Sequence, residues 1–443
     1  MSTELLTILM FAGIFVGVFT GFPIAFVLGS LGIIFGLIAL EPHQLLYMVP
    51  LRLFKTYSTE VFAAIPLFIF MGALVERSGI ADRAYEVTHK MMGPVRGGLA
   101  VATVVVCTFF AAATGVVGAS VVTMGLIAIP SMVSRGYDKS LATGTVAAGG
   151  TLGQLIPPSI MLILYAPMAG VSVVDMFAGA ILPGLILSAL FISYILIRCY
   201  INPNVGPALT VEERGKIVLR SLLLEIVKSV LPFAFLIMAV LGSIFLGFAA
   251  PTEAAAMGAF GSLILAAIYR KLTWQALQGA AYISLKSTAM VMFIVLGAFL
   301  FTGTFLSAGC GKAVSSFLLG FGLGPWGVLL ILLVLIFFLG MFIDWIGILY
   351  IMVPIFGPMM IALGFEPLWL GLIICISLQM SFITPPFAYT IFYLKGLSLE
   401  GIRLGDIYRG VIPFVFLQAI GLALCLIFKP LTLWLPSLLA KQF

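Results

Sequence analysis

The sequence has little charge. Lys, Arg, Asp and Glu make up 9% of its 443 residues, whereas soluble globular proteins carry about 25% charged residues. A chain that is 63% hydrophobic has too little polar surface to surround a water-soluble core, so a soluble protein is excluded. Only helices and closed barrels satisfy backbone polar groups in lipid, and barrel strands are alternating segments of about ten residues. The apolar runs are much longer here, which predicts an all-α polytopic membrane protein.

The chain also lacks the motifs of metal sites and of common enzymes. Its two histidines, His43 and His89, lie in polar stretches, and neither H-E-x-x-H nor G-x-S-x-G occurs. The five cysteines have no C-x-x-C spacing and are interpreted as packing residues: Cys107, Cys199, Cys310, Cys375 and Cys425. The formal charge of +6 comes from basic residues that flank apolar runs and form no stripe, which argues against nucleic acid as a partner. We therefore expect no enzyme activity and no cofactor.

Charge-free runs predict where the chain crosses the membrane, because a span needs about 20 apolar residues. Leu5–Leu40 is long enough for two spans, interrupted near Pro23. The other runs are Val61–Val75, Gly97–Ser134, Ser140–Val174, Met176–Ile197, Ser229–Thr252, Ala254–Tyr269, Ser287–Gly311, Ala313–Ile343, Trp345–Phe365, Pro367–Leu394 and Gly410–Phe428.

Two regions predict re-entrant hairpins, which enter and leave the membrane on one side. Residues 97–134 contain no charge, and as a single helix they would reach about 57 Å, nearly twice the ~30 Å hydrocarbon thickness. Their centre, Ala111–Ser120, consists mostly of small residues. Residues 326–354 form the second predicted hairpin, with its tip at Gly340–Trp345. A pair of ordinary short spans is the alternative for each region.

Landmarks recur at a nearly constant offset, which predicts two structural repeats. The matches, 228 to 231 positions apart, are Pro23 with Pro251, Ser78-Gly79 with Ala308-Gly309, Gly93-Pro94 with Gly324-Pro325, Leu155-Ile156-Pro157-Pro158 with Ile383-Thr384-Pro385-Pro386, and Tyr165 with Tyr393. We divide the chain into a first repeat (1–200), a linker (201–228) and a second repeat (229–443). The linker is polar and predicts an amphipathic helix on the cytoplasmic surface.

Basic residues predict the orientation. With the N-terminus on the periplasmic side, ten spans and two hairpins place 16 Lys and Arg residues inside and five outside, with Lys286 at an inner helix end. This threading makes the second repeat enter the membrane from the face opposite to the first. Inverted repeats are typical of secondary transporters.

A Pro-Pro pair lies within a long apolar run in each predicted repeat. Each proline removes an N–H group and breaks the helix, so residues about 140–165 and 367–394 are predicted to form broken helices. Freed carbonyl groups at membrane depth need a cavity, an ion or a protein partner, and half-helix ends with carbonyl and hydroxyl oxygens suit sodium. A kinked packing helix is the alternative reading of each break.

Two acidic residues lie within or between apolar runs. Asp344 at the second predicted hairpin tip costs about 2.5–3.5 kcal/mol at the bilayer centre, so we expect it to face a cavity or a partner. A simple helix cap near the outer water is the alternative for Asp344. Glu253, in Pro251-Thr252-Glu253-Ala254, is predicted to cap the helix that follows it.

Several short motifs together resemble one family. They are Ala64-Ile65-Pro66-Leu67-Phe68, Thr114-Gly115-Val116-Val117-Gly118-Ala119, Leu155-Ile156-Pro157-Pro158-Ser159-Ile160, Pro251-Thr252-Glu253-Ala254-Ala255-Ala256 and Phe382-Ile383-Thr384-Pro385-Pro386-Phe387. The set resembles the large membrane (M) subunit of tripartite ATP-independent periplasmic (TRAP) transporters, over essentially the whole chain.

The resemblance implies an ion transporter superfamily-like fold with an elevator-type motion. It implies sodium-driven uptake of a small carboxylate across the bacterial inner membrane. The substrate would arrive on a soluble periplasmic binding (P) protein, and a small membrane (Q) subunit would bind the scaffold. Neither partner is fused to this sequence, so both are expected as separate proteins.

The resemblance also implies the ion ligands. The first sodium site would use Thr114, Val116, Gly153, Ile156 and Pro158, and the second would use Gly340, Ser381 and Thr384. Substrate contacts are predicted at Gly115, Ser159, Asp344 and Pro386. The chain departs from one common family form, because Thr114-Gly115-Val116-Val117 stands where many members have Ser-Gly-Ser-Ser.

Two other functions are weighed against this one. A stand-alone sodium-coupled dicarboxylate carrier of the same superfamily would need no binding protein. An intramembrane aspartyl protease would need a pair of aspartates, and Tyr137-Asp138 with Asp344 is the nearest arrangement. No G-x-G-D precedes Asp344, and Asp138 lies at a cytoplasmic helix end, so the protease is the remote alternative.

Overall fold

The computed structural model describes residues 2–209, 225–227, 229–386 and 388–441, and this part of the chain is helical without a strand. The elements of the first half are α1 (Thr3–Phe19), α2 (Ile24–Ala39), α3 (Pro42–Tyr57), η1 (Glu60–Ala63), α4 (Ala64–Arg77), α5 (Ile80–Met92), α6 (Gly98–Thr114), α7 (Val117–Ser134), α8 (Lys139–Thr151), η2 (Leu152–Gln154), α9 (Ile160–Ala169), α10 (Val173–Ile201) and η3 (Pro203–Val205). The elements of the second half are α13 (Leu231–Phe245), α14 (Pro251–Ile268), α15 (Trp274–Ser307), α16 (Cys310–Gly320), α17 (Pro325–Leu339), α18 (Trp345–Ala362), α19 (Pro367–Ser381), α20 (Tyr389–Gly396), α21 (Leu404–Ile427) and α22 (Pro430–Leu439). The predicted all-α class is confirmed.

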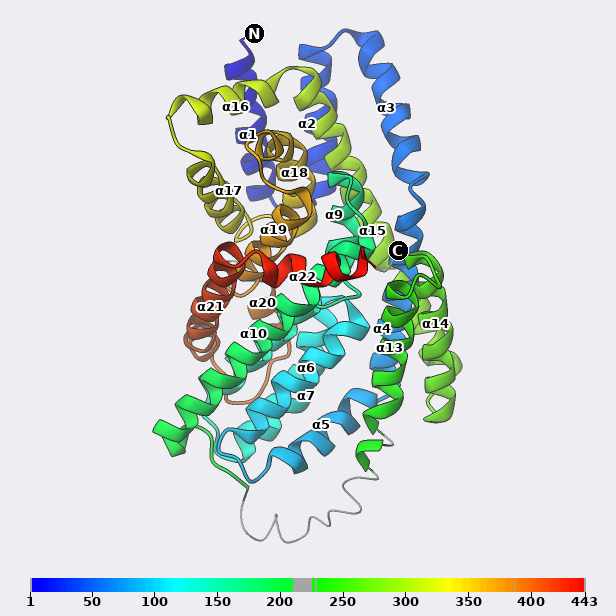
Figure 1. The fold of residues 1–443 in the computed structure, drawn as a ribbon, viewed down its shortest axis with the longest axis vertical. Helices are drawn as coiled ribbons and strands as arrows, with labels where there is room; N and C mark the ends of the chain where they lie inside the picture. Colours follow the sequence, from blue (N-terminus) through cyan, green and yellow to red (C-terminus); the bar gives the residue numbers. More distant parts are fainter. Residues whose placement is uncertain (1, 210–224, 228, 387, 442–443) are drawn as a thin grey trace.

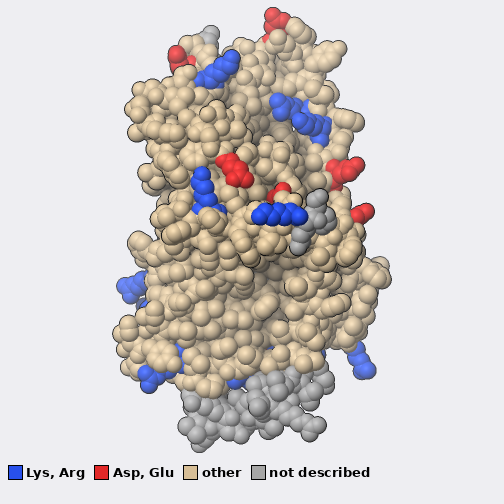
Figure 2. Space-filling view, viewed as in Figure 1, with Lys and Arg blue, Asp and Glu red and all other residues tan. Residues whose placement is uncertain are grey.

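The outer surface suits a lipid environment. Large apolar side chains are widely exposed, including Tyr47 and Phe248, each at 81%. Most of the face in Figure 2 carries no charged side chain. Among the described residues, seven helices are individually long and apolar enough to cross a membrane, or eight if the bent pair of α3 with η1 and α4 forms one span. The chain is therefore a polytopic helical membrane protein.

Two helix pairs occupy the ranges predicted for the hairpins. Gly115 and Val116 join α6 to α7, and residues 340–344 join α17 to α18. Figure 1 shows α6 and α7 in the lower half of the molecule and α17 and α18 in the upper half. Helix α18 continues to Ala362, beyond the predicted end at 354, because Pro354 and Pro358 are accommodated inside it.

Both Pro-Pro pairs lie between two shorter helices. The first interruption separates η2 from α9, and the second separates α19 from α20. Both Pro-Pro peptide bonds are cis. The halves of the two broken helices interleave, because α9 packs against α18 and α19 while α20 packs against α7 and α8.

Paired landmarks adopt the same local geometry. Gly79 and Gly309 both take the left-handed conformation, with φ of 69° and 80°, and each begins a short helix, α5 or α16. Only glycine adopts this conformation without a steric cost. Glu253 accepts a hydrogen bond from the Ala250 N–H at 2.8 Å, which confirms its predicted role as the cap of α14.

Some predicted boundaries are wrong because charge-free runs do not mark helix ends. Helix α15 begins at Trp274 instead of Ser287, so Lys286 lies inside a 34-residue helix instead of at its end. A single lysine can extend its ammonium along a helix surface while its stem remains in apolar surroundings. The same rule missed α3, which carries Arg52 and Lys55. The amphipathic helix predicted within 201–228 falls mainly on residues 210–224 and 228, which are outside the described residues.

Candidate functional site

A cavity of about 650 Å³ lies where the two helix-pair tips meet. The first tip contributes Gly115 and Val116, and the second contributes Asp344. Residues beside both Pro-Pro breaks complete this wall: Gln154, Ile160, Phe382, Tyr389 and Tyr393. The opposite wall comes from α2, α4 and α15: Ile24, Ala25, Phe26, Ile69, Ser287, Ala289, Met290, Val291, Phe293 and Ile294. The cavity is large enough for a small organic molecule.

The first tip touches the first break directly. A Cβ atom built on Gly115 would lie 2.8 Å from the carbonyl oxygen of Pro158, and Gly115 has a φ of 59°. The preceding Thr114 is 2% exposed, and its hydroxyl lies 3.0 Å from the Ser120 hydroxyl and donates to the Phe110 carbonyl at 3.1 Å. The contact, called the first junction below, requires glycine both for its backbone conformation and for its closeness to Pro158.

The first break is almost fully enclosed. Gly153 and Ser159 are buried, and the Ser159 hydroxyl donates to the carbonyl of Gln154. The side chain of Ile156 faces α10, since a Cβ atom on Gly184 would lie 2.6 Å from Ile156 Cγ1. Because an isoleucine side chain has no oxygen, Ile156 could contribute only its backbone carbonyl to an ion site.

The second tip touches the second break in the same way. A Cβ atom built on Gly340 would lie 2.5 Å from Ser381 Cβ, so this second junction also depends on a glycine. The hydroxyl of Ser381 donates to Leu378 at 2.6 Å, and that of Thr384 donates to Met380 at 2.7 Å. Both hydroxyl oxygens keep lone pairs that a cation could use.

Asp344 both caps a helix and borders the cavity. Its carboxylate accepts hydrogen bonds from the Ile346 N–H at 3.1 Å and from the Tyr389 hydroxyl at 3.0 Å. Asp344 is thus both the N-cap of α18 and a residue of the cavity wall. Tyr389 begins α20, so this contact joins the second tip to the second half of the second broken helix.

Buried glutamines connect the two breaks. The Gln379 amide donates to the Thr151 hydroxyl at 3.1 Å, and the Gln418 amide donates to the same oxygen at 3.0 Å. Thr151 directly precedes η2, and Gln379 lies two residues before the end of α19. The two breaks therefore lie side by side in the centre of the molecule.

The cavity combines helix N-termini with a single acidic side chain. The side chains at the N-caps of α7 and α9, Val116 and Ser159, make no capping hydrogen bond, so backbone N–H groups at these ends lack a side-chain partner. Gln154 is 2% exposed, and its Nε2 has no hydrogen-bond partner among the described residues. Of the described residues that line the cavity, Asp344 is the only acidic one, and none is basic. The site thus offers amide donors to an anion but no cationic side chain.

The structure brings together part of the predicted site. The junctions unite Gly115 with Pro158 and Gly340 with Ser381. Of the predicted substrate contacts, Gly115 and Asp344 line the cavity. Ser159 is buried with its hydroxyl bonded internally, and Pro386 is exposed but does not line the cavity wall.

Sequence reasoning missed several cavity residues. Gln154, Tyr389 and Tyr393 all lie within a few positions of a Pro-Pro pair, and polarity beside the breaks was a usable signal for them. The apolar wall from α2 and α15 carried no such signal, because its residues have the same composition as lipid-facing helices.

The chain is similar to known transporter subunits over most of its length. The family model described as "Tripartite ATP-independent periplasmic transporter, DctM component" matches residues 11–431. The C4-dicarboxylate TRAP transporter large permease protein DctM of Pseudomonas aeruginosa is 32% identical over 395 residues, covering 88% of this chain and 90% of that protein. Its counterpart in Vibrio cholerae is 31% identical over 462 residues, covering 99% and 98%.

Two further comparisons extend this result. The ectoine/5-hydroxyectoine TRAP transporter large permease protein UehC of Ruegeria pomeroyi is 30% identical over 383 residues, covering 83% of each chain. The crystal structure of the YdaH transporter of Alcanivorax borkumensis is similar with a TM-score of 0.66 over 98% of both chains, at 14% identity, which shows a shared fold. With its two tips, two breaks and shared cavity, the chain belongs to the DctM component family, the large permease proteins of tripartite ATP-independent periplasmic transporters.

Proposed function

We propose that the chain catalyses sodium-coupled uptake of a small carboxylate delivered by a periplasmic binding protein. The observation that carries this proposal is the lack of a cationic side chain among the described lining residues of the cavity between the two tips. Its wall holds amide donors and one carboxylate, Asp344, but no lysine, arginine or histidine among the described lining residues. A carboxylate in this cavity therefore needs positive charge from another source, and co-transported sodium ions supply it.

The two junctions are the proposed sodium sites. At the first, Thr114, Val116, Gly153, Ile156 and Pro158 would provide oxygen atoms, mainly from the backbone. At the second, Gly340, Ser381 and Thr384 would do so. The described residues contain no group of three or more His, Cys, Asp or Glu side chains that could hold a metal ion. Neutral oxygens of this kind suit a hard monovalent cation better than a transition metal.

Amide donors are the proposed contacts of the substrate carboxylate. The N-termini of α7 and α9 open beside Gly118 and Ile160 on the cavity wall, and helix N-termini attract anions. The unpartnered Nε2 of Gln154 adds a side-chain donor. Gly115 allows the substrate to approach the backbone of the first tip closely, while Ser159 and Pro386 would act at the edge of this site.

The packing supports an elevator-type movement. The helices that carry the tips and breaks interleave, with α20 against α7 and α9 against α18, so they would move as one body. Helices α2 and α15 pack extensively on each other and form the opposite wall, as a fixed scaffold would. With the N-terminus periplasmic in the bacterial inner membrane, each sodium ion entering at about 100 mV contributes about 2.3 kcal/mol.

A small membrane subunit and a periplasmic binding protein are the proposed partners. One relative is described as the isethionate TRAP transporter permease protein DctMQ of Oleidesulfovibrio alaskensis, and this chain covers 61% of that protein. The remaining length of that protein leaves room for a second membrane component. We propose that a corresponding small membrane component binds the scaffold of this chain.

Uptake into proteoliposomes tests the proposal. The permease with its small subunit is reconstituted, the binding protein is added outside, and the substrate is first identified by a thermal-shift screen of that binding protein. We expect concentrative uptake with an inward sodium gradient and none when potassium replaces sodium. Uptake that persists unchanged without the gradient would refute sodium coupling. Equal uptake of free substrate without the binding protein would instead indicate a stand-alone carrier.

A further inference from the structure

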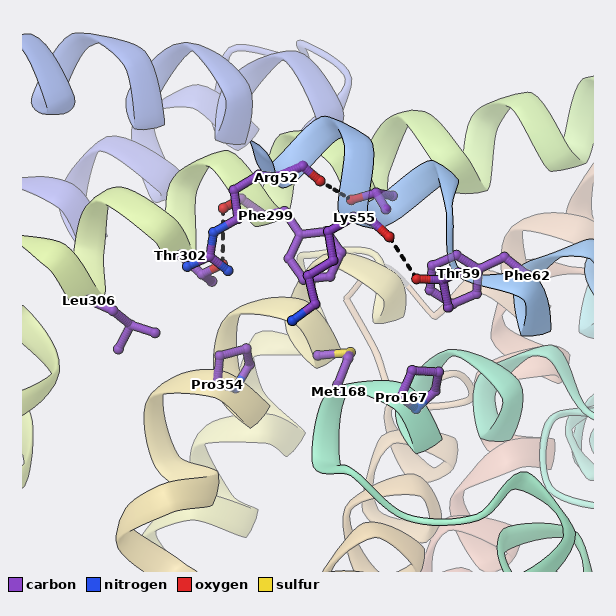
Figure 3. A pocket seen from close by; sticks show the side chains of 11 residues that line it. Arg52, Lys55, Thr59, Phe62, Pro167, Met168, Phe299, Thr302, Leu306 and Pro354 are labelled. Carbon is purple, nitrogen blue, oxygen red and sulfur yellow. Dashed lines mark hydrogen bonds between the residues drawn. The ribbon is translucent and has the colours of Figure 1, made fainter. Parts of the chain in front are cut away.

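A second, smaller pocket carries two cationic side chains. Arg52 and Lys55 lie three positions apart on α3, so they occupy one face of that helix. They border a pocket of about 180 Å³ between α3, the end of α9, α15 and α18. Its other lining residues are Thr56, Thr59, Phe62, Pro167, Met168, Phe299, Thr302, Leu306 and Pro354 (Figure 3).

These two cations have no acidic partner in the described part of the chain. Neither Arg52 nor Lys55 forms an ion pair there, and no Asp or Glu lines the pocket. Figure 3 shows the Lys55 ammonium extending into the space between α3 and Pro354. Arg52 is half-buried against the apolar side chains of the pocket, whereas Lys55 is exposed and accessible to a ligand that arrives from outside. An anion placed here would meet uncompensated positive charge.

The hydroxyl groups of the pocket do not compete for this anion. Thr56 donates to the Arg52 carbonyl, Thr59 donates to the Lys55 carbonyl, and Thr302 donates to the Ala298 carbonyl, each at 2.8 Å. Each hydroxyl proton is thereby used within the local backbone. The guanidinium and the ammonium are therefore the free donors that determine which ligand fits.

The pocket lies along the same helices as the large cavity. On α9, Ile160 borders the cavity and Pro167 borders the pocket, a separation of about 10 Å at about 1.5 Å per residue. On α18, Ile346 borders the cavity and Pro354 borders the pocket, about 12 Å away by the same rise. The pocket is thus displaced from the cavity along α9 and α18, between these helices and α3 with α15.

We propose that this pocket is an outer anion site that binds the carboxylate of the substrate before it reaches the cavity. The inference rests on the proposed function, in that the transported molecule is a carboxylate. The outer site supplies the positive charge that the inner cavity lacks, so it concentrates an anion without help from sodium. The phosphate of an anionic lipid has a similar chemistry, and the experiment separates the two sources.

Charged thiol reagents measure the potential of the pocket. Thr59→Cys places a thiol at its edge, and the five native cysteines are at most 1% exposed. We expect the anionic sulfonatoethyl methanethiosulfonate to react faster than the cationic trimethylammonioethyl reagent. Adding Arg52→Gln and Lys55→Gln removes two nearby charges and should lower this rate ratio by about tenfold or more. Lys312→Gln, on α16, is the matched control and should leave the ratio unchanged.

Protection of Thr59→Cys identifies the ligand. The full chain is reconstituted in phosphatidylcholine liposomes, and succinate is the probe. Slower modification in the presence of succinate, lost in the double variant, supports the outer site. An unchanged rate ratio in the double variant, or protection by added phosphatidylglycerol but not by succinate, overturns it.

Uptake measurements distinguish a failure of the outer-site inference from a failure of the proposed function. We expect the Arg52→Gln/Lys55→Gln variant to show a raised KM at an unchanged sodium dependence. Failure of the proposed function would remove sodium dependence from the wild type while succinate protection persisted. If the outer site does not exist, the wild type and the Arg52→Gln/Lys55→Gln variant will have the same KM, and succinate will protect Thr59→Cys equally with and without these two substitutions.

Discussion

The first and second junctions have the same backbone arrangement but differ in the chemistry of their side chains. Each brings a glycine at a hairpin tip against residues of a broken helix. The first junction is enclosed, with Thr114 and Ser159 buried and no charge at the tip. The second has a tip that ends in Asp344 and a break whose prolines, Pro385 and Pro386, are exposed. The two junctions thus share a glycine contact, whereas an acidic side chain occurs only at the second tip.

We infer from this difference that the first and second junctions have separate roles. Closely packed backbone at the first junction leaves little room for side-chain variation, so its chemistry is that of carbonyl groups and helix ends. Gly340 and Ser381 of the second junction are buried as well, but the neighbouring Pro385 and Pro386 are exposed and the tip ends in the acidic Asp344. We infer that the first junction holds sodium by geometry, and that the second couples sodium to the charge of the substrate.

Adding a methyl group at either junction should give the largest effect. Gly115→Ala meets a backbone carbonyl at a positive φ, whereas Gly340→Ala meets Ser381 Cβ without that additional backbone strain. Overpacking costs about 1–3 kcal/mol, which corresponds to a loss of sodium-driven uptake of about fivefold to 150-fold. We expect the larger loss for Gly115→Ala in the proteoliposome assay.

Gly320→Ala is the matched control for both changes. No atom lies within 4 Å of a Cβ atom built at Gly320, so this methyl group should not alter uptake. If both junction variants transported as well as Gly320→Ala, close contact between tips and breaks would have no part in transport.

Neutralising the second tip should have an intermediate effect. Asp344→Asn keeps the shape of the helix cap but removes the negative charge from the cavity. We expect the affinity for the cognate carboxylate at low sodium to rise about tenfold, because one repulsive charge is lost at short range. Binding isotherms at low and high sodium measure this change.

Tyr389→Phe and Asp82→Asn are the controls for that experiment. Tyr389→Phe removes the hydrogen bond to Asp344 but keeps the charge, and Asp82 is exposed on α5. Both should retain the sodium dependence of the wild type. An Asp344→Asn protein with the same sodium dependence as these controls would show that the carboxylate does not set the coupling.

Removing one hydroxyl ligand should have the smallest effect. Thr384→Ala deletes a single neutral oxygen from the second junction, a loss of about 0.5–1.5 kcal/mol, or about threefold to tenfold in sodium affinity. Thr88→Ala is a close match, since its hydroxyl also donates to the carbonyl four residues earlier at 2.7 Å. A sodium response for Thr384→Ala equal to that of Thr88→Ala would remove Thr384 from the site.

Much of the fold was predictable because lipid imposes simple rules. Apolar run length predicted the helical class, and Pro-Pro pairs predicted the interruptions at 157–158 and 385–386. Helix ends were predicted less well, because Lys286 and Arg52 lie within helices that charge-free runs excluded. A charged residue interrupts an apolar run in the sequence without interrupting the backbone hydrogen bonds.

The site was only partly predictable because its composition depends on tertiary packing. Gly115 and Gly340 were recognisable as tip residues, but their contacts with Pro158 and Ser381 join segments far apart in the sequence. The approach of Tyr389 to Asp344 likewise depends on how α20 packs beside the second tip. Spacing along the chain carries no information on such contacts.

Equilibrium binding of radioactive sodium to the purified chain tests the central claim, that the two junctions hold the coupling ions. We predict saturable binding of about two ions per chain that excess potassium does not displace, one ion for each half of an inverted-repeat site. Gly115→Ala and Gly340→Ala should each lose about one ion, and Gly320→Ala should lose none. Absence of saturable binding to the wild type, or equal binding to all four proteins, would contradict the account.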